Sequence, residues 1–313
     1  MAVVEHLLGH AGALARHFAS VDPRLIVLAF VFHVANHGLR SLAWRNVLAA
    51  AYPDKRVSFP GVTAAYATGV ATNALLPARG GDAVKVALVR AQIPESSFLT
   101  VGATMPVLMI FDTVATALLL LAVGITGGVP FHSELPAATG LISEHPFVTT
   151  MLVITLAIGL SRLVRRGRAR LSSLWVRVRQ GGAVLGSPVR YLTRVALVQA
   201  ISWLCRLAVV MSLLAAFGLP ASPLVAGVVM VVAGVSTAMP LTPGGAGTQQ
   251  VLLAYALTGV ASAGAVVSFS VAMQVGVTAV NAFCGLCGAM FACRTLKPLA
   301  AVRSGLALAR AGG

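Results

Sequence analysis

Long apolar runs alternate with short polar segments along the whole chain. The runs cover about residues 25–48, 61–76, 98–126, 146–163, 193–217, 222–239 and 264–292. A membrane-spanning helix needs about 20 predominantly apolar residues, and most of these runs reach that length. Two of them are irregular: the second run is short and ends in a charged motif, and the sixth is interrupted by a stretch rich in Pro and Gly. The pattern predicts an all-α integral membrane protein, built as a polytopic helical bundle.

Composition supports this interpretation and changes the meaning of the charge. The chain of 313 residues is 58% hydrophobic and 10% charged, whereas a soluble domain averages about 25% charged residues. Its net charge of +15 would suggest nucleic acid in a soluble protein. Here the basic residues gather at the ends of apolar runs, where they set topology and meet anionic lipid, and no nucleic-acid motif is present. We therefore expect anionic membrane lipids as partners and no nucleic acid.

The distribution of arginine predicts which segments face the cytoplasm. The segment 162–194 contains nine arginines and no acidic residue, so it is expected to be a basic cytoplasmic loop. The loop at 127–145 has two glutamates and no Lys or Arg, and should lie outside. Residues 1–23 read as an amphipathic segment on the membrane surface and 296–313 as a basic cytoplasmic tail. This leaves residues 24–295 as a multi-pass domain in the cell membrane.

The same rule makes the two irregular runs informative. Both ends of the stretch 57–97 are basic and therefore read as cytoplasmic, while 222–260 starts and ends outside. Each stretch is best explained as a re-entrant hairpin with a broken helix, one entering from each face. Span, hairpin and span then occur twice in opposite orientation, in 25–126 and 193–292. Such an inverted repeat with paired broken helices is typical of a transport site near the membrane midplane.

The motif TNALLPARGGDAVK predicts the tip of the first hairpin. Pro77 cannot donate a backbone hydrogen bond, and the following glycine pair permits unusual conformations. A helix start at Asp82, with Arg79 and Lys85 nearby, is suited to binding a phosphate. The alternative is a tight turn whose charges satisfy each other or reach the interface. The candidate binding residues here are Pro77, Arg79, Gly80, Gly81, Asp82 and Lys85.

The motif PLTPGGAGTQQ predicts an uncharged second hairpin tip. Its hydroxyl and amide side chains offer hydrogen bonds, and its glycines expose backbone. A simple kink between two helices is the alternative. The candidates for lining the opposite side of the site are Thr242, Pro243, Gly244, Gly245, Gly247 and Gln250.

Isolated polar residues within the apolar runs complete the candidate site. Arg206 and Asp112 both lie deep in the membrane, and we expect them either to form an ion pair or to face the substrate. Two histidines four residues apart, with Arg40 on the same helical face, lack a further metal ligand, so we expect no metal and no cofactor. Gln274 and Asn281 are expected to face the bundle interior, where hydrogen bonds between helices would explain them equally well. No enzyme motif is present, so we expect no catalytic residue.

Taken in order, the two hairpin motifs resemble the transmembrane flippase-like domain of the lysylphosphatidylglycerol synthases. The first reads Asn73-x-x-Leu-Pro77-x-Arg79-x-Gly81-Asp82-x-x-Lys85, and the second reads Pro240-x-Thr-Pro243-Gly-Gly-x-Gly247. The resemblance covers roughly residues 20–295 and adds Asn73 to the candidate binding residues. The soluble aminoacyltransferase domain of the full synthases is not found in these 313 residues, so we do not expect synthase activity.

The chain departs from the family pattern at several charged positions. The family usually has Gly-Glu-x-x-Arg where this chain has Gly81-Asp82-Ala-Val-Lys85, and Glu-Arg where it has Leu108-Met109. Gln250 stands where the family commonly has an acidic residue, and Gln274 where it commonly has arginine.

The resemblance and the residues together imply a protein that translocates or binds an anionic phospholipid or lipid-linked phosphate. The hairpins would meet near the midplane, with the first motif holding the head group and Arg206 as an auxiliary cation. The alternatives are a small-solute or ion transporter, and a non-catalytic membrane subunit of a lipid- or envelope-modifying enzyme. Homo-oligomers or such an enzyme partner are compatible with each of these functions.

Overall fold

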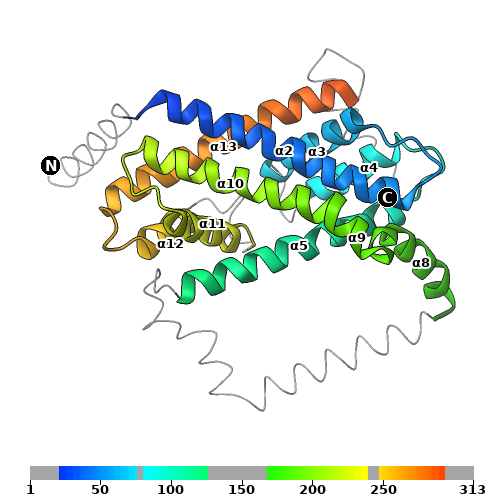
Figure 1. The fold of residues 1–313 in the computed structure, drawn as a ribbon. Helices are drawn as coiled ribbons and strands as arrows, with labels where there is room; N and C mark the ends of the chain where they lie inside the picture. Colours follow the sequence, from blue (N-terminus) through cyan, green and yellow to red (C-terminus); the bar gives the residue numbers. More distant parts are fainter. Residues whose placement is uncertain (1–20, 76–79, 126–167, 239–246, 293–313) are drawn as a thin grey trace.

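All regular structure in the described part of the chain is helical. The computed structural model describes residues 21–75, 80–125, 168–238 and 247–292 (Figure 1). By length and composition, four helical segments in these ranges can cross a membrane: α2 (Pro23–Ala51), α5 (Phe98–Ile125), α13 (Ala263–Ala292) and the continuous segment Pro188–Ala216. They confirm four of the apolar runs as helices. The run at 146–163, the segment 1–20 and the tail 296–313 lie outside the described residues.

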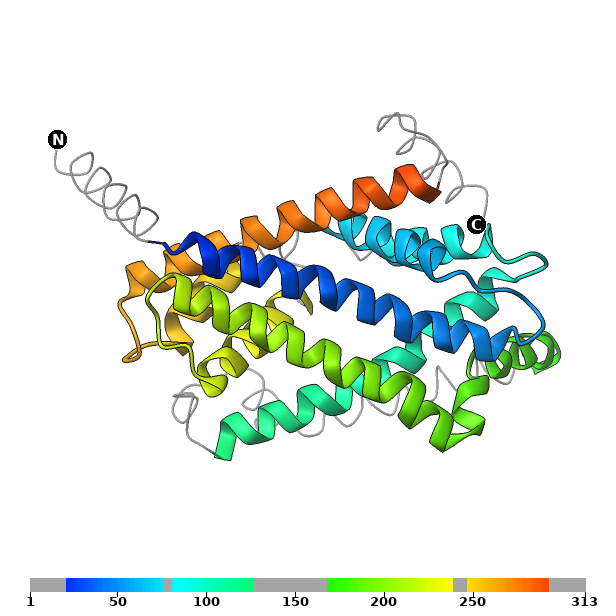
Figure 2. The same ribbon diagram turned by 45° about the horizontal axis from the view of Figure 1, so that its top comes forward.

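Helices α2 and α10 (Leu197–Ala216) lie antiparallel, side by side (Figures 1 and 2). At one end, the backbone N–H of Asp22 donates to the carbonyl of Ala216, with N and O 3.3 Å apart. Near the other end, the Asn46 amide donates to the carbonyl of Arg194 at 2.8 Å. The N-terminus of α2 is therefore next to the C-terminus of α10, which fixes the depth at which their side chains meet.

A widened turn precedes α10. The segment begins with α9 (Pro188–Tyr191) and passes through a π-helical turn at Leu192–Ala196. Such turns disturb the regular pairing of backbone carbonyls and are frequent at functional sites. The hydrogen bond from the Asn46 side chain satisfies one carbonyl of this turn, that of Arg194. The turn is thus supported by α2 rather than by its own helix alone.

Two short helix pairs occupy opposite ends of the bundle (Figure 1). The first pair is α3 (Phe59–Leu75) and α4 (Gly80–Arg90), and the second is α11 (Pro223–Ala238) and α12 (Thr248–Ala256). Helices α3 and α4 are antiparallel, because Asn73 bonds the start of α4 while Gln92, just after α4, bonds the carbonyl of Gly61 at the start of α3. At 1.5 Å per residue, α4 and α12 are about 16 and 14 Å long, which is short of a hydrocarbon core of about 30 Å.

Small residues let α3 and α13 pack closely. A Cβ atom added to Gly288 would lie 2.6 Å from the Ala64 carbonyl oxygen, and one added to Gly285 would overlap the Ala71 side chain. The Thr68 hydroxyl also reaches the Gly285 carbonyl at 3.4 Å. Close backbone approach through small residues is how helices associate in lipid, where burial from water provides no drive.

The outer faces of the long helices are apolar and uncovered. Leu118, Leu204, Val275 and Phe283 each expose more than 60% of their surface, at 61%, 64%, 64% and 69%. An apolar exterior of this kind fits a lipid environment and not an aqueous one.

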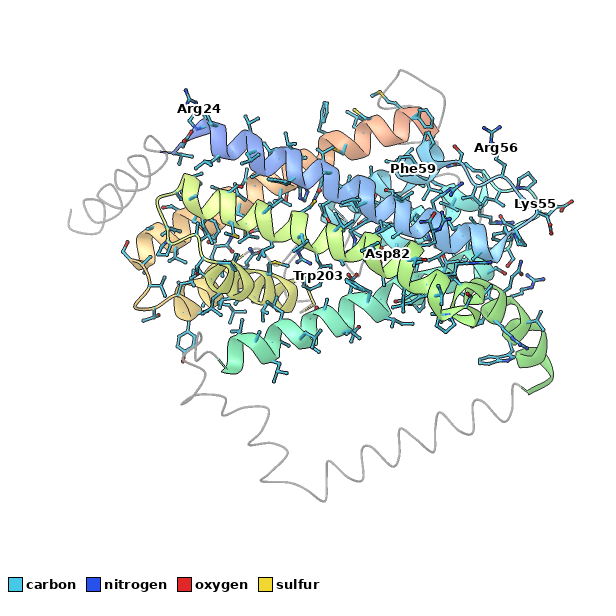
Figure 3. All side chains as sticks on the ribbon, in the orientation of Figure 1. Arg24, Lys55, Arg56, Phe59, Asp82 and Trp203 are labelled. Carbon is cyan, nitrogen blue, oxygen red and sulfur yellow. The ribbon has the colours of Figure 1, made fainter. Side chains whose placement is uncertain are left out.

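Basic residues gather at one end of the bundle. Figure 3 shows Lys55 and Arg56 at that end, Arg24 at the opposite end, and Asp82 and Trp203 between them. Helix α8 (Arg168–Gly181) also lies at the Lys55 end, where its Gln180 side chain donates to the carbonyl of Ala51 at 3.0 Å. The described part of the basic segment 162–194 therefore lies beside the basic turn after α2.

Candidate functional site

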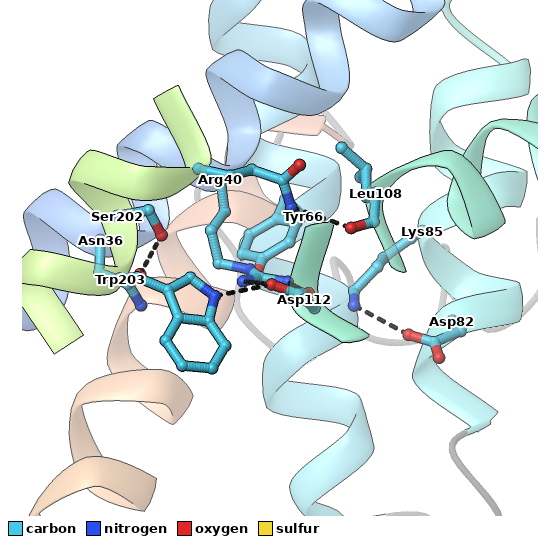
Figure 4. A network of polar contacts seen from close by, with 10 residues as sticks. Asn36, Arg40, Tyr66, Asp82, Lys85, Leu108, Asp112, Ser202 and Trp203 are labelled. Atoms are coloured by element: carbon cyan, nitrogen blue, oxygen red, sulfur yellow. Dashed lines mark hydrogen bonds and ion pairs between the residues drawn. The ribbon is translucent and has the colours of Figure 1, made fainter. Parts of the chain in front are cut away.

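Charged and aromatic side chains from five helices meet inside the bundle (Figure 4). Their positions come from α2, α3, α4, α5 and α10. We call the following seven residues the interior network: Arg40, Tyr66, Asp82, Lys85, Asp112, Trp203 and Arg206. Five of the seven are charged, which is costly within a membrane and makes the interior network the candidate functional site.

The centre of the interior network is the ion pair between Arg40 and Asp112. The two guanidinium NH2 groups of Arg40 donate to the two carboxylate oxygens, at 3.2 and 2.6 Å. Arg40 Nε also donates to the Tyr66 hydroxyl at 2.9 Å, and Trp203 Nε1 donates to Asp112 Oδ1 at 2.9 Å. Charge-assisted pairs of this two-point form are the strongest hydrogen bonds available to side chains.

The expected pair between Asp112 and Arg206 is not formed within the described residues. Helices α2 and α5 are antiparallel, since Trp44, about one turn after Arg40, donates through Nε1 at 2.8 Å to the hydroxyl of Thr104, about two turns before Asp112. This register brings Arg40 to the depth of Asp112. On α10, Trp203 occupies the position opposite Asp112, and Arg206 lies nearly one turn further along. Asp112 is thus paired with Arg40 of α2. The spacing of residues along the sequence does not show which helix supplies this partner.

The predicted residues of the first hairpin that the structure describes are brought together at the start of α4. Lys85 Nζ lies 2.8 Å from Asp82 Oδ1 and 4.9 Å from the centre of the Tyr66 ring. Asn73 Nδ2 donates to the same Asp82 oxygen at 3.1 Å, and Asn73 Oδ1 accepts the backbone N–H of Gly81 at 2.7 Å. These helix-start groups therefore have partners within the protein, and Lys85 is buried. Gly80, where α4 begins, is adjacent, while Pro77 and Arg79 lie outside the described residues.

Arg206 differs from the other two cations of the interior network. Its guanidinium carbon lies 5.7 Å from the centre of the Trp203 ring, an arrangement within cation–π range. It has no hydrogen bond and no ion pair with any residue that the structure describes. Within the described ranges, its guanidinium N–H groups thus have no hydrogen-bond acceptor.

A histidine pair lies next to the interior network. The Nε2 atoms of His33 and His37 lie 2.8 and 2.7 Å from the same oxygen, Asn281 Oδ1 on α13. The His37 and Tyr66 rings are 5.8 Å apart. Asn281 thus forms the interhelical hydrogen bonds that were the alternative explanation for it. Within the described ranges, no group of three or more His, Cys, Asp or Glu side chains is placed to hold a metal ion.

Gln250 and Gln274 join the second hairpin to α13. Gln250 Oε1 accepts the backbone N–H of Gly247 at 2.8 Å, and Gln250 Nε2 donates to Gln274 Oε1 at 2.7 Å. Gln274 thus forms the interhelical hydrogen bond that was the alternative explanation for it. The pair also joins the two positions at which an acid and an arginine are common in the resembled family. The other residues predicted for this hairpin, Thr242, Pro243, Gly244 and Gly245, lie outside the described residues.

Sequence reasoning missed Tyr66 and Trp203. Tyr66 contacts both Arg40 and Lys85, and Trp203 contacts both Asp112 and Arg206. Aromatic residues in apolar runs are usually lipid-facing or packed, so neither carried a functional signal. The signal that could have identified Trp203 is its polar indole N–H, three residues before Arg206.

The apolar exterior and charged interior define a helical membrane protein with a polar centre. Comparison with protein families agrees with this class: the model of the lysylphosphatidylglycerol synthase TM region matches residues 6–285. The chain belongs to that family, as its two hairpin motifs predicted. No curated protein and no solved structure matches the chain.

Proposed function

We propose that this protein binds an anionic phospholipid or lipid-linked phosphate and moves its head group between the leaflets of the cell membrane. The observation that carries the proposal is the interior network, which gathers cations and hydrogen-bond donors inside the bundle. The family membership and the apolar exterior support a lipid rather than an aqueous ligand. In this proposal the chain performs no covalent chemistry.

The pattern of helix contacts supports an inverted repeat. Helix α3 packs on α13 and α11 packs on α5, while α3 pairs with α4 and α11 with α12. Each of these contacts becomes another observed contact under one exchange of helices. That exchange replaces α2 with α10, α3 with α11, α4 with α12 and α5 with α13, and the reverse. The repeat would comprise residues 25–126 and 193–292, with α2 and α10 meeting at its pseudo-symmetry axis.

The short helix pairs support two re-entrant hairpins. They lie at opposite ends of the bundle, and the second helix of each is too short to cross a membrane. We place the end with Lys55 and α8 in the cytoplasm, because basic residues favour that side. The first hairpin then enters from the cytoplasm and the second from outside, and their tips, including Arg79 and Thr242, would contact the head group.

Translocation can be tested in proteoliposomes. Vesicles containing the purified protein and fluorescent phosphatidylglycerol are treated with an impermeant quencher that reaches only the outer leaflet. In protein-free vesicles, the quenched fraction of the fluorescent lipid equals the fraction in the outer leaflet. We expect the quenched fraction to exceed this value when the protein is present. Quenching that stops at this value would contradict lipid translocation and favour a solute transporter or an accessory subunit.

The hairpin site can be tested in the same assay. The double variant Arg79→Ala, Lys85→Ala should lower the rate strongly, whereas the matched variant Lys55→Ala, Arg56→Ala removes two basic residues outside the bundle interior and should not. Unchanged translocation by the first double variant would exclude the first hairpin as the head-group site.

A further inference from the structure

We infer that Arg206 is the residue that binds the phosphate of the ligand, and that the ligand carries a single negative charge there, as a phosphodiester does. This inference rests on the proposed function and makes its site more specific. Among the cations of the interior network, Lys85 is paired with Asp82 and Arg40 with Asp112. Arg206 alone in this network has no direct hydrogen bond or ion pair to a carboxylate among the described residues, and Asp112 attracts it only from beyond ion-pair distance.

The described charges of the interior network do not balance among themselves. Its described residues include three cations, Arg40, Lys85 and Arg206, and two carboxylates, Asp82 and Asp112, so three minus two leaves one positive charge. An uncompensated charge is unfavourable in a membrane interior, and cations there pair or mark an ion or substrate pathway. A bound monoanion would neutralise the excess.

The described surroundings of Arg206 suit a phosphate, because none of these residues accepts a hydrogen bond from its guanidinium group. Guanidinium N–H groups match phosphate oxygens in a two-point arrangement. The Trp203 ring contacts Arg206 and is itself held by its hydrogen bond to Asp112. Asp112 therefore helps to position Arg206 indirectly, because it holds the Trp203 ring that contacts the Arg206 guanidinium.

The depth of Arg206 suits a lipid head group in transit. It lies 12 residues beyond Arg194, about 18 Å along a helix, and so well inside the membrane. Ser202 of α10 bonds Asn36 of α2 at 2.6 Å, and one turn further along this antiparallel pair Arg206 comes to the level of His33.

Lipid binding by the purified protein tests this inference directly. Wild-type protein in detergent is titrated with phosphatidylglycerol, and separately with phosphatidylcholine carrying the same acyl chains, and bound lipid is counted by native mass spectrometry. We expect saturable binding that favours phosphatidylglycerol. Arg206→Gln should weaken it about 10- to 100-fold, the range for losing hydrogen bonds to a charged group. Arg206→Lys keeps the positive charge but lacks the two-point donor geometry of a guanidinium group. Its affinity for phosphatidylglycerol should fall between those of the wild type and Arg206→Gln.

Matched controls separate this effect from general loss of charge. Arg190→Gln removes an exposed arginine from α9, at the start of the same helical segment, and should bind phosphatidylglycerol like the wild type.

Competition with inorganic phosphate distinguishes the source of the anion. Displacement by phosphate at low concentration would assign the site to a soluble phosphate, and resistance to it would assign the site to the lipid head group; both support phosphate binding at Arg206.

Two results would overturn the inference. One is wild-type protein that binds phosphatidylglycerol no more tightly than phosphatidylcholine and binds no inorganic phosphate. The other is folded Arg206→Gln protein that binds as tightly as the wild type; if this variant does not fold, equal binding by folded Arg206→Met and the wild type has the same meaning. Binding that depends on Arg206, without any translocation in vesicles, would contradict only the proposed function.

Discussion

Arg40 on α2 and Asp112 on α5 form a two-point ion pair across the bundle, with nitrogen and oxygen atoms 2.6 and 3.2 Å apart. Tyr66 and Trp203 each add one hydrogen bond to it. Four helices are thereby joined at one depth in the membrane by two charges that neutralise each other. Because Asp112 is paired with Arg40, Arg206 is the cation of the interior network that forms no ion pair with a described carboxylate.

Breaking this pair should destabilise the protein strongly. Asp112→Asn leaves the Arg40 cation in the interior without its carboxylate. Removing one partner of a fully buried pair typically lowers the free energy of unfolding by about 3–5 kcal/mol, and this pair, with side chains 24% and 27% exposed, should lose less than that. Arg40→Gln should act similarly, and the double variant should lose less than the sum of the two, because the residues share one interaction. Denaturant unfolding followed by circular dichroism measures all three differences.

A surface pair provides the control for that experiment. Lys55 and Glu95 also approach to 2.6 Å, but the Glu95 side chain is 81% exposed. Water and salt screen such a pair, so Glu95→Gln should leave the unfolding free energy nearly unchanged. Equal effects of Asp112→Asn and Glu95→Gln would show that the pair between α2 and α5 is not buried in the working protein.

The packing of α3 on α13 predicts a strong position dependence for glycine substitutions. Gly285→Ala would push a methyl group into Ala71, and overpacking of this kind lowers stability by about 1–3 kcal/mol. Gly264→Ala, on the same helix, meets no atom within 4 Å and should be neutral or slightly stabilising, because Ala favours helix. Thermal unfolding of the two variants in one detergent checks the contrast. Similar melting temperatures would argue against close packing of α3 and α13.

The sequence predicts the long helices better than the contacts between them. Lipid requires every backbone group to be bonded within its own segment, so long apolar runs such as 98–126 and 264–292 leave helix as the available structure. The partner of Asp112 depends instead on the register between α2 and α5, which a single chain does not encode in its spacing. The motif containing Asn73 marks where the helix breaks, but only the structure shows that its side chain bonds Gly81 and Asp82.

Asn73 should stabilise the first hairpin through both ends of its amide. Asn73→Ala removes the acceptor for the Gly81 N–H and the donor to Asp82, and losing such a helix cap lowers stability by about 0.5–2 kcal/mol. Asn73→Asp keeps the acceptor but adds a negative charge beside Asp82, so it should not restore full stability. The neighbouring variant Thr72→Val loses only a bond within α3 and should change stability less than either. Hydrogen exchange of the amides at the start of α4 measures the local effect, and equal exchange in Asn73→Ala and Thr72→Val would contradict the capping role.

The contact between Gln250 and Gln274 predicts that this neutral pair can be replaced by an ion pair. Gln250→Glu alone places a carboxylate near a neutral amide, and Gln274→Arg alone adds a cation there, so each single variant should lower stability. The double variant brings the charges together at the 2.7 Å contact, and a carboxylate at position 250 still accepts the Gly247 N–H. A double-mutant cycle should therefore show a favourable coupling of about 0.5–3 kcal/mol. Additive losses would mean that the two side chains do not meet, and that the second hairpin is not held against α13 at this point.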